Sequence, residues 1–131
     1  MADDAALDLM DRFADFIVAS PTSYHAAAEV ARQLSAAGWA QQDETRPWSD
    51  DPGGHFFVRD GAVMAWWVPE EITPSTGIRV VGSHTDSPTL KLKPNPNVTN
   101  AGWQQVGMEI YGGPLLNSWL DRELGLAGRL V

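Results

Sequence analysis

The chain has 131 residues, with nine Lys and Arg against seventeen Asp and Glu, which gives a formal charge of −8. Hydrophobic residues make up 44% and charged residues 20%, as in soluble globular proteins, and no apolar run approaches the ~20 residues of a membrane span. The absence of cysteine excludes disulfides, thiolate metal sites and a cysteine nucleophile, and a pI near 4.6 argues against a nucleic-acid partner because such binding depends on clustered cations.

The same composition sets expectations for folding and location. A compact chain of this size buries roughly two-thirds of the surface that its unfolded form exposes, which is enough for a hydrophobic core. The N-terminus is acidic, whereas a secretory signal begins with basic residues followed by an apolar run. Without such a signal and without cysteine, we expect a cytoplasmic protein with no membrane partner.

The first predicted element is an amphipathic helix between Ala5 and Ala19. Apolar residues recur at helical spacing along it, so one stripe of the helix is expected to face a core. This stripe consists of Leu7, Met10, Phe13, Ile17 and Val18.

A second helix is predicted from Tyr24 to Ala37, after a break at Ser20-Pro21. Thr22 or Ser23 is expected to cap its N-terminus, because a hydroxyl oxygen there accepts a hydrogen bond from a free backbone N–H. Gly38 follows the helix at the position where a left-handed C-terminal cap is common.

The middle of the chain predicts β-structure. A polar stretch from Gln41 to Gly54 is expected to be a loop. The segments His55–Arg59 and Ala62–Val68 flank Asp60-Gly61, a dipeptide typical of tight turns, so together they predict a β-hairpin. After a second loop, the β-branched run Gly77–Gly82 predicts a buried strand.

Strand signals continue towards the C-terminus. Leu90–Lys93 alternates in polarity, Pro94–Asn97 interrupts the pattern, and Gln105–Tyr111 predicts a further strand that Gly112-Gly113 ends. Leu126–Val131 has the composition of a strand that is just beginning.

The pair His84 and Asp86 is the constellation that stands out chemically. Residues two apart in an extended segment point to the same side, so the carboxylate can approach the imidazole. A metal-binding His commonly donates its other N–H to such a carboxylate, and the ends of strands are where open α/β sheets place ligand sites. A catalytic zinc needs about three protein ligands, however, and only His84 is well placed. Chance, or a turn at Asp86-Ser87-Pro88, is the alternative explanation.

The other titratable residues have simpler explanations. His25 falls in the first turn of the second helix, which favours a solvated or capping side chain. His55 begins a strand beside two phenylalanines, which favours an edge or packing role. The adjacent acidic pairs Asp50-Asp51 and Glu70-Glu71 lie in predicted loops and are expected to be solvated.

Lys91 and Lys93 are the only lysines in the chain, and both follow His84 closely. In an acidic chain they form a local positive spot that could meet an acidic substrate or a C-terminal carboxylate. The favoured alternative is an edge strand that lysines protect against unwanted pairing.

Several short segments, in this order and spacing, resemble one known family. The segments are Ser20–Ala26, Val80–Pro88, Tyr111–Gly113, Ser118–Leu124 and Leu126–Arg129. Together they resemble the N-terminal portion of the aspartyl aminopeptidases, the M18 zinc metallopeptidases.

This resemblance implies an α/β fold of two parts. Residues 1–92 would be the first segment of a phosphorylase/hydrolase-like zinc peptidase domain. Residues 93–131 would begin an inserted, β-rich dimerisation domain. The complete protein would be a homo-oligomer that releases N-terminal residues from peptide substrates, and the family name suggests acidic residues.

The resemblance also implies roles for individual residues. His84 aligns with the first zinc ligand of the family, and Asp86 aligns with the residue that orients this ligand. Complete members hold two Zn²⁺ per active site, which activate a water to attack the N-terminal peptide bond, and a glutamate serves as general base. The bridging carboxylate, the base and the remaining ligands are expected beyond residue 131.

Two hypotheses follow. In the first, residues 1–131 are the N-terminal portion of a zinc-dependent aminopeptidase and by themselves hold zinc weakly and catalyse nothing. In the second, the chain is a non-catalytic truncated remnant or an assembly module whose metal motif is idle.

Overall fold

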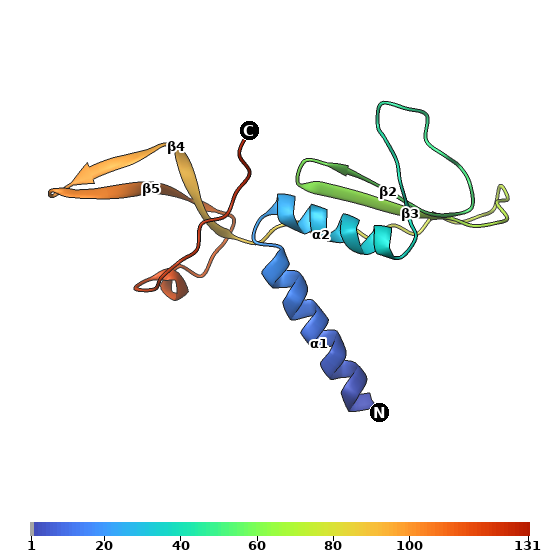
Figure 1. Cartoon of the computed structure of the whole chain (residues 1–131), viewed down its shortest axis with the longest axis horizontal. Coiled ribbons are helices and arrows are strands. Elements are labelled where there is room, and N and C mark those ends of the chain that lie inside the picture. Colours follow the sequence, from blue (N-terminus) through green and yellow to red (C-terminus); the bar gives the residue numbers. More distant parts are fainter. Residues whose placement is uncertain (1) are drawn as a thin grey trace. The chain divides into compact units, whose positions relative to one another are not determined.

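The computed structural model describes residues 2–131, and its mixed α/β elements fall into two compact units. The first unit comprises the chain up to Asp86 together with Ala127–Val131, and the second comprises Ser87–Leu126. Figure 1 labels the elements of both units. The predicted boundary between residues 92 and 93 concerns the domains of a complete protein and stays a prediction.

Both predicted helices are present. Helix α1 spans Ala2–Ala19 and helix α2 spans Ser23–Ala36. Thr22 caps α2 as predicted, since its side chain accepts a hydrogen bond from the backbone N–H of His25. Gly38 has a φ of +82°, and the N–H groups of Gly38 and Trp39 donate to carbonyls of the last turn, as in a Schellman cap.

The prediction that the apolar stripe of α1 faces a core is wrong for this structure. The exposed fractions along the stripe are 57% for Leu7, 66% for Met10, 62% for Phe13, 56% for Ile17 and 80% for Val18. A helical period shows that one face of a helix is apolar, but another element must lie against that face to bury it.

The sheet of the first unit has the strand order β1-β2-β3. Strand β1 (Ala40–Gln41) runs parallel to β2 (Gly53–Arg59), and β2 pairs antiparallel with β3 (Ala62–Val68). Arg59 lies opposite Ala62, so Asp60-Gly61 is the two-residue turn that the sequence predicts. Gln41 and Gly53 belong to strands, which corrects both ends of the predicted loop.

Helix α2 lies against β2 and β3, and this contact holds the small core (Figure 1). The buried apolar residues are Ala26 and Ala27 on α2 and Phe56 on β2. Close approach is possible because Gly61 has no side chain: a Cβ built there would lie 2.8 Å from the Cβ of Ser23. The start of α2 therefore rests directly on the turn between β2 and β3.

An aromatic cluster occupies the other face of β2 and β3. Trp48 stacks on Trp66 with ring centroids 5.1 Å apart and lies 5.0 Å from the ring of Phe57. His55, only 3% exposed, also stacks on Trp66, and its ring nitrogens contact the side chain of Gln42 and the carbonyl of Asp51. The prediction of a packing role for His55 is confirmed.

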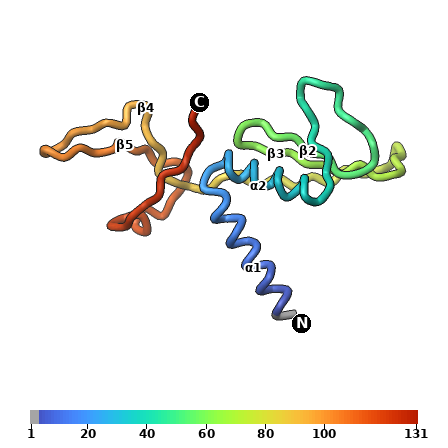
Figure 2. Tube along the Cα trace, in the orientation of Figure 1, coloured from blue at the N-terminus to red at the C-terminus, as the bar shows by residue number. Residues whose placement is uncertain are grey.

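The predicted strand Gly77–Gly82 is absent. This segment is irregular (Figure 2), with Ile78 90%, Val80 86% and Val81 97% exposed. A strand forms only when a neighbour completes its hydrogen bonds, and within residues 2–131 no strand pairs with this segment. Leu126–Val131 forms no strand either.

The second unit contains one long hairpin. Strand β4 (Thr89–Asn100) pairs antiparallel with β5 (Trp103–Tyr111), and the short 3₁₀ helix η1 spans Leu116–Trp119. The predicted interruption at Pro94–Asn97 is instead an irregular part of β4, where the pairing register shifts between Leu92 and Asn97. Proline cannot donate a ladder hydrogen bond, which explains a bulge at this point.

The chain buries less surface than a compact fold of its mass. The accessible surface is 11222 Å², whereas a compact monomer of 14.3 kDa exposes roughly 6,800 Å². Two separate compact units of half this mass would still expose only roughly 8,200 Å². The chain therefore buries less than the two-thirds of its unfolded surface that a compact chain of this size could bury. No helix in the described range has the length and apolar character needed to cross a membrane.

The contact between Gly61 and Ser23 generates a first prediction. Gly61→Ala should lower the free energy of unfolding by about 1–3 kcal/mol, because the new methyl group must displace the start of α2. Urea denaturation followed by circular dichroism measures this change. Gly77→Ala is the matched control, since no atom lies within 4 Å of a Cβ there. Equal stability of the two variants would contradict the contact.

Candidate functional site

His84 and Asp86 contact each other as the sequence predicts. Their Nδ1 and Oδ1 atoms are 2.7 Å apart, and Nδ1 also lies 3.0 Å from the backbone carbonyl of Asp86. The His84 side chain is 75% exposed and that of Asp86 is 23% exposed. The pair therefore forms without the predicted strand, because the two residues are close enough in sequence for a local turn to bring them together.

This geometry determines what the imidazole can do. Both neighbours of Nδ1 are oxygen acceptors, so the neutral ring carries its proton on Nδ1. The lone pair of Nε2 is then available, and this arrangement is the one in which a carboxylate orients a metal-binding histidine. His84 can serve as one metal ligand, with Asp86 holding its ring.

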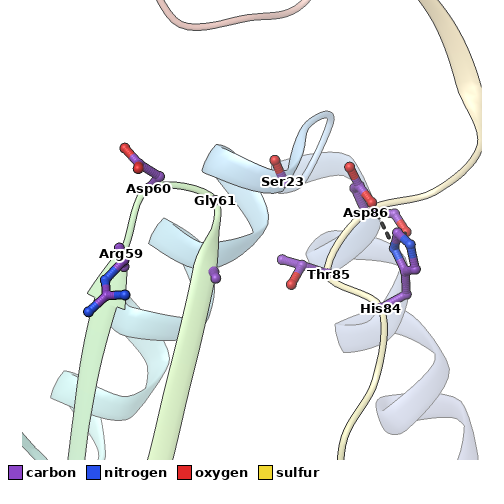
Figure 3. A pocket seen from close by; sticks show the side chains of 8 residues that line it. Ser23, Arg59, Asp60, Gly61, His84, Thr85 and Asp86 are labelled. Carbon is purple, nitrogen blue, oxygen red and sulfur yellow. Dashed lines mark hydrogen bonds and ion pairs between the residues drawn. The ribbon is translucent and has the colours of Figure 1, made fainter.

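A shallow pocket of about 410 Å³ lies beside the pair, and Figure 3 shows the side chains that line it. Its walls come from the start of α2, the turn between β2 and β3, and the segment that carries His84. The lining residues are Ser23, Arg59, Asp60, Gly61, Ala62, His84, Thr85 and Asp86. Of these residues, the sequence identifies only His84 and Asp86 as candidates. The other walls of the pocket come from elements that are distant in sequence, so no local pattern points to them.

The charges on the hairpin wall are already paired. Nε of Arg59 donates to Glu44 at 3.0 Å, and this hydrogen bond raises the pKa of the Arg59 guanidinium. Asp60 accepts a hydrogen bond from Arg129 at 3.2 Å. Neither residue presents an unpaired charge to His84.

The remaining predicted candidates lie outside this pocket. His25 lies in the first turn of α2, where its Nδ1 contacts the hydroxyl of Thr22, the N-cap residue, at 2.7 Å. Both acidic pairs in the loops are exposed, as expected. Lys91 lies opposite Glu109 on a two-stranded sheet, and its Nζ is 5.6 Å from the ring centroid of Tyr111, which agrees with the edge-strand explanation.

The described residues do not form a complete zinc site. Across residues 2–131 there is no group of three or more His, Cys, Asp or Glu side chains that could hold a metal ion. Zinc needs about three protein ligands, and His84 offers a single free Nε2 atom. The three histidines do not converge.

Comparison with known proteins points to one family. The family model "Aminopeptidase I zinc metalloprotease (M18)" matches residues 16–131. The "Probable M18 family aminopeptidase 2" of Streptomyces avermitilis is 54% identical over 120 residues, which cover 92% of this chain and 28% of that protein.

Solved structures agree with this match. The cryo-EM structure of the Ape4 and Nbr1 complex has a TM-score of 0.78 at 36% identity, covering 92% of this chain and 23% of that one. The S. cerevesiae mApe1 dodecamer has a TM-score of 0.77 at 32% identity, covering 88% and 28%. The chain thus spans between a quarter and a third of the length of the curated relatives it matches.

The contact between Asp86 and His84 generates a second prediction. Asp86→Ala removes one acceptor of the Nδ1 proton, so the neutral His84 ring should shift towards the Nε2–H tautomer. The ¹⁵N chemical shifts of the His84 ring measure the tautomer ratio. Asp60→Ala is the control, because Asp60 lines the same pocket without contacting His84. A tautomer ratio that is insensitive to Asp86 would contradict the orienting role.

Proposed function

This chain belongs to the M18 family of zinc metalloproteases, of which it represents the N-terminal portion, and we propose that the complete protein is a zinc-dependent aminopeptidase. Its substrates would be peptides, from which it would release the N-terminal residue. The single observation that carries this proposal is the contact between Asp86 and His84 within a segment that the family model matches.

The proposed roles follow from that contact. His84 would bind zinc through Nε2, and Asp86 would hold the ring in the tautomer that leaves Nε2 free. Bound zinc, expected as two ions per active site, would supply an activated water for attack on the peptide bond. The other ligands and the general base would come from outside residues 1–131, because the described residues contain no group of three or more His, Cys, Asp or Glu side chains that could hold a metal ion.

Further parts of the proposal concern architecture and location. Residues 1–92 would form the first segment of a phosphorylase/hydrolase-like peptidase domain, and residues 93–131 would begin an inserted dimerisation domain. The mixed α/β fold and its match to the mApe1 dodecamer support this arrangement and a homo-oligomer. We also propose a cytoplasmic location, on the absence of cysteine, and a preference for acidic N-terminal residues, on the family resemblance.

The proposed role of His84 generates a third prediction, tested on the full-length gene product. His84→Ala should lower the zinc content from two ions per site towards one and reduce aminopeptidase activity by at least about 100-fold, and Asp86→Asn should weaken zinc binding about 10–100-fold. Elemental analysis and hydrolysis of aminoacyl p-nitroanilides measure the two quantities. His25→Ala is the matched histidine control, since the His25 side chain contacts Thr22 and does not line the pocket beside His84.

Two outcomes separate the competing hypotheses. Unchanged zinc and activity in His84→Ala would overturn the role of His84. Sequencing the gene past the codon for Val131 tests the alternative: an open frame with further Asp, Glu and His supports the enzyme, whereas a stop codon supports the remnant or assembly module.

The hairpin of the second unit generates a fourth prediction. One face of β4 and β5 is apolar, formed by Leu90, Leu92, Val106, Met108 and Ile110. A two-stranded hairpin is marginally stable alone in water, so this face needs a partner, and we propose a second copy of the chain. Val106, which is 61% exposed, is the test position.

Val106→Asp should weaken self-association by at least about tenfold, because a buried, unpaired carboxylate is costly. Light scattering after size exclusion measures the mass over a range of concentrations. Val98→Asp is the matched control: Val98 lies opposite Gln105, one position along β5 from Val106 and so on the other face. Identical masses for the two variants would contradict this interface.

A further inference from the structure

Arg129 makes two contacts that span much of the chain. Its guanidinium carbon lies 4.2 Å from the ring centroid of Tyr24, and its Nη2 donates to Oδ1 of Asp60 at 3.2 Å. These contacts belong to the first unit, to which Ala127–Val131 returns after the whole of the second unit. The sequence singles out Leu126–Arg129 as a motif, but the proposed metal chemistry assigns it no role.

One partner of Arg129 lines the pocket beside His84, and the other is the sequence neighbour of a lining residue. Asp60 lines the pocket itself, and Tyr24 follows Ser23, which also lines it. Figure 3 shows the hairpin turn and the start of α2 on one side, with the His84–Asp86 pair on the other. Arg129 therefore joins the two elements that make up this wall.

The turn between β2 and β3 meets the start of α2 beside Asp60. Asp60 has a φ of +52°, the left-handed conformation that Asp-Gly favours in tight hairpin turns. Beside it, Gly61 rests on Ser23 without any side chain to lock the two elements together. A guanidinium that pairs with Asp60 and covers Tyr24 restrains both at once.

The contact is better suited to positioning than to stabilising the fold. The side chains of Arg129 and Asp60 are 45% and 68% exposed, so water and salt screen the ion pair. Cation–π contacts at exposed sites are also weak. Removal of Arg129 should leave the protein folded while the turn and the start of α2 move apart.

We infer that Arg129 is a positioning residue for the pocket beside His84, which it shapes by holding Asp60 and Tyr24 in place. The expected effect on catalysis rests on the proposed aminopeptidase function. The contacts of Arg129 with Asp60 and Tyr24 do not depend on that function. Because the hairpin wall faces the pocket without contacting His84, its movement affects the binding of substrate and leaves the bound metal unchanged.

The kinetic test uses the full-length gene product and an aminoacyl p-nitroanilide. Arg129→Ala should raise KM about fivefold while kcat and zinc content stay within twofold of wild type. Arg129→Lys should restore KM, because an ammonium can still pair with Asp60 and cover Tyr24. Arg122→Ala is the matched control: Arg122 donates to the carbonyl of Ser118 in the second unit and should leave KM unchanged.

A second measurement, on the same variants, does not depend on activity. Hydrogen exchange followed by mass spectrometry should show faster exchange in Arg129→Ala at residues 57–63 and at the start of α2, residues 23–28. Arg129→Lys and Arg122→Ala should exchange like wild type at both segments.

The outcomes are distinct. A lower kcat at unchanged KM would mean that Arg129 only stabilises the fold, and unchanged kinetics would mean that it has no role; either result overturns the inference. If the wild type lacks activity, the proposed function fails and hydrogen exchange decides alone. Faster exchange confined to the two segments in Arg129→Ala then supports the contact, and exchange equal to wild type overturns it.

Discussion

The close approach of α2 to the β2–β3 hairpin is the constraint on which the rest of the first unit depends. Two glycines permit it: Gly61 rests on Ser23, and Gly54 rests on the ring of Trp39, which follows the C-terminal cap of α2. Between these points the helix buries Ala26 and Ala27. Because the approach fixes the turn beside the start of α2, it also creates the wall of the pocket that faces His84. The contact between Gly61 and Ser23 therefore serves both the packing of the first unit and the shape of the pocket.

The site combines a local part with a distant part, and they have different physical origins. His84 and Asp86 form a pair across two residues, so a single turn of backbone suffices to orient the imidazole. The facing wall comes from residues more than twenty positions earlier, and Arg129 reaches it from the other end of the chain. The proposed function connects the pair to zinc, and the residues that the structure describes include no group of three ligands that would complete a zinc site.

Exposed apolar surface marks two of the places where prediction and structure differ. The stripe of α1 and the run Gly77–Gly82 carry the pattern of buried structure, yet both are exposed. In each case the pattern correctly describes the side chains, but burial also requires a second surface. The relatives that this chain matches are more than three times its length.

The sequence by itself determined the local structure. The helix period, the caps at Thr22 and Gly38, the Asp60-Gly61 turn and the approach of Asp86 to His84 depend on residues a few positions apart, and all are present. Tertiary structure alone decided whether Gly77–Gly82 became a strand, whether the α1 stripe was covered, and which residues formed the pocket. Hydrogen-bond ladders and packing need partners that no local pattern identifies. The contact from Arg129 to Asp60, 69 residues apart, belongs to this second class.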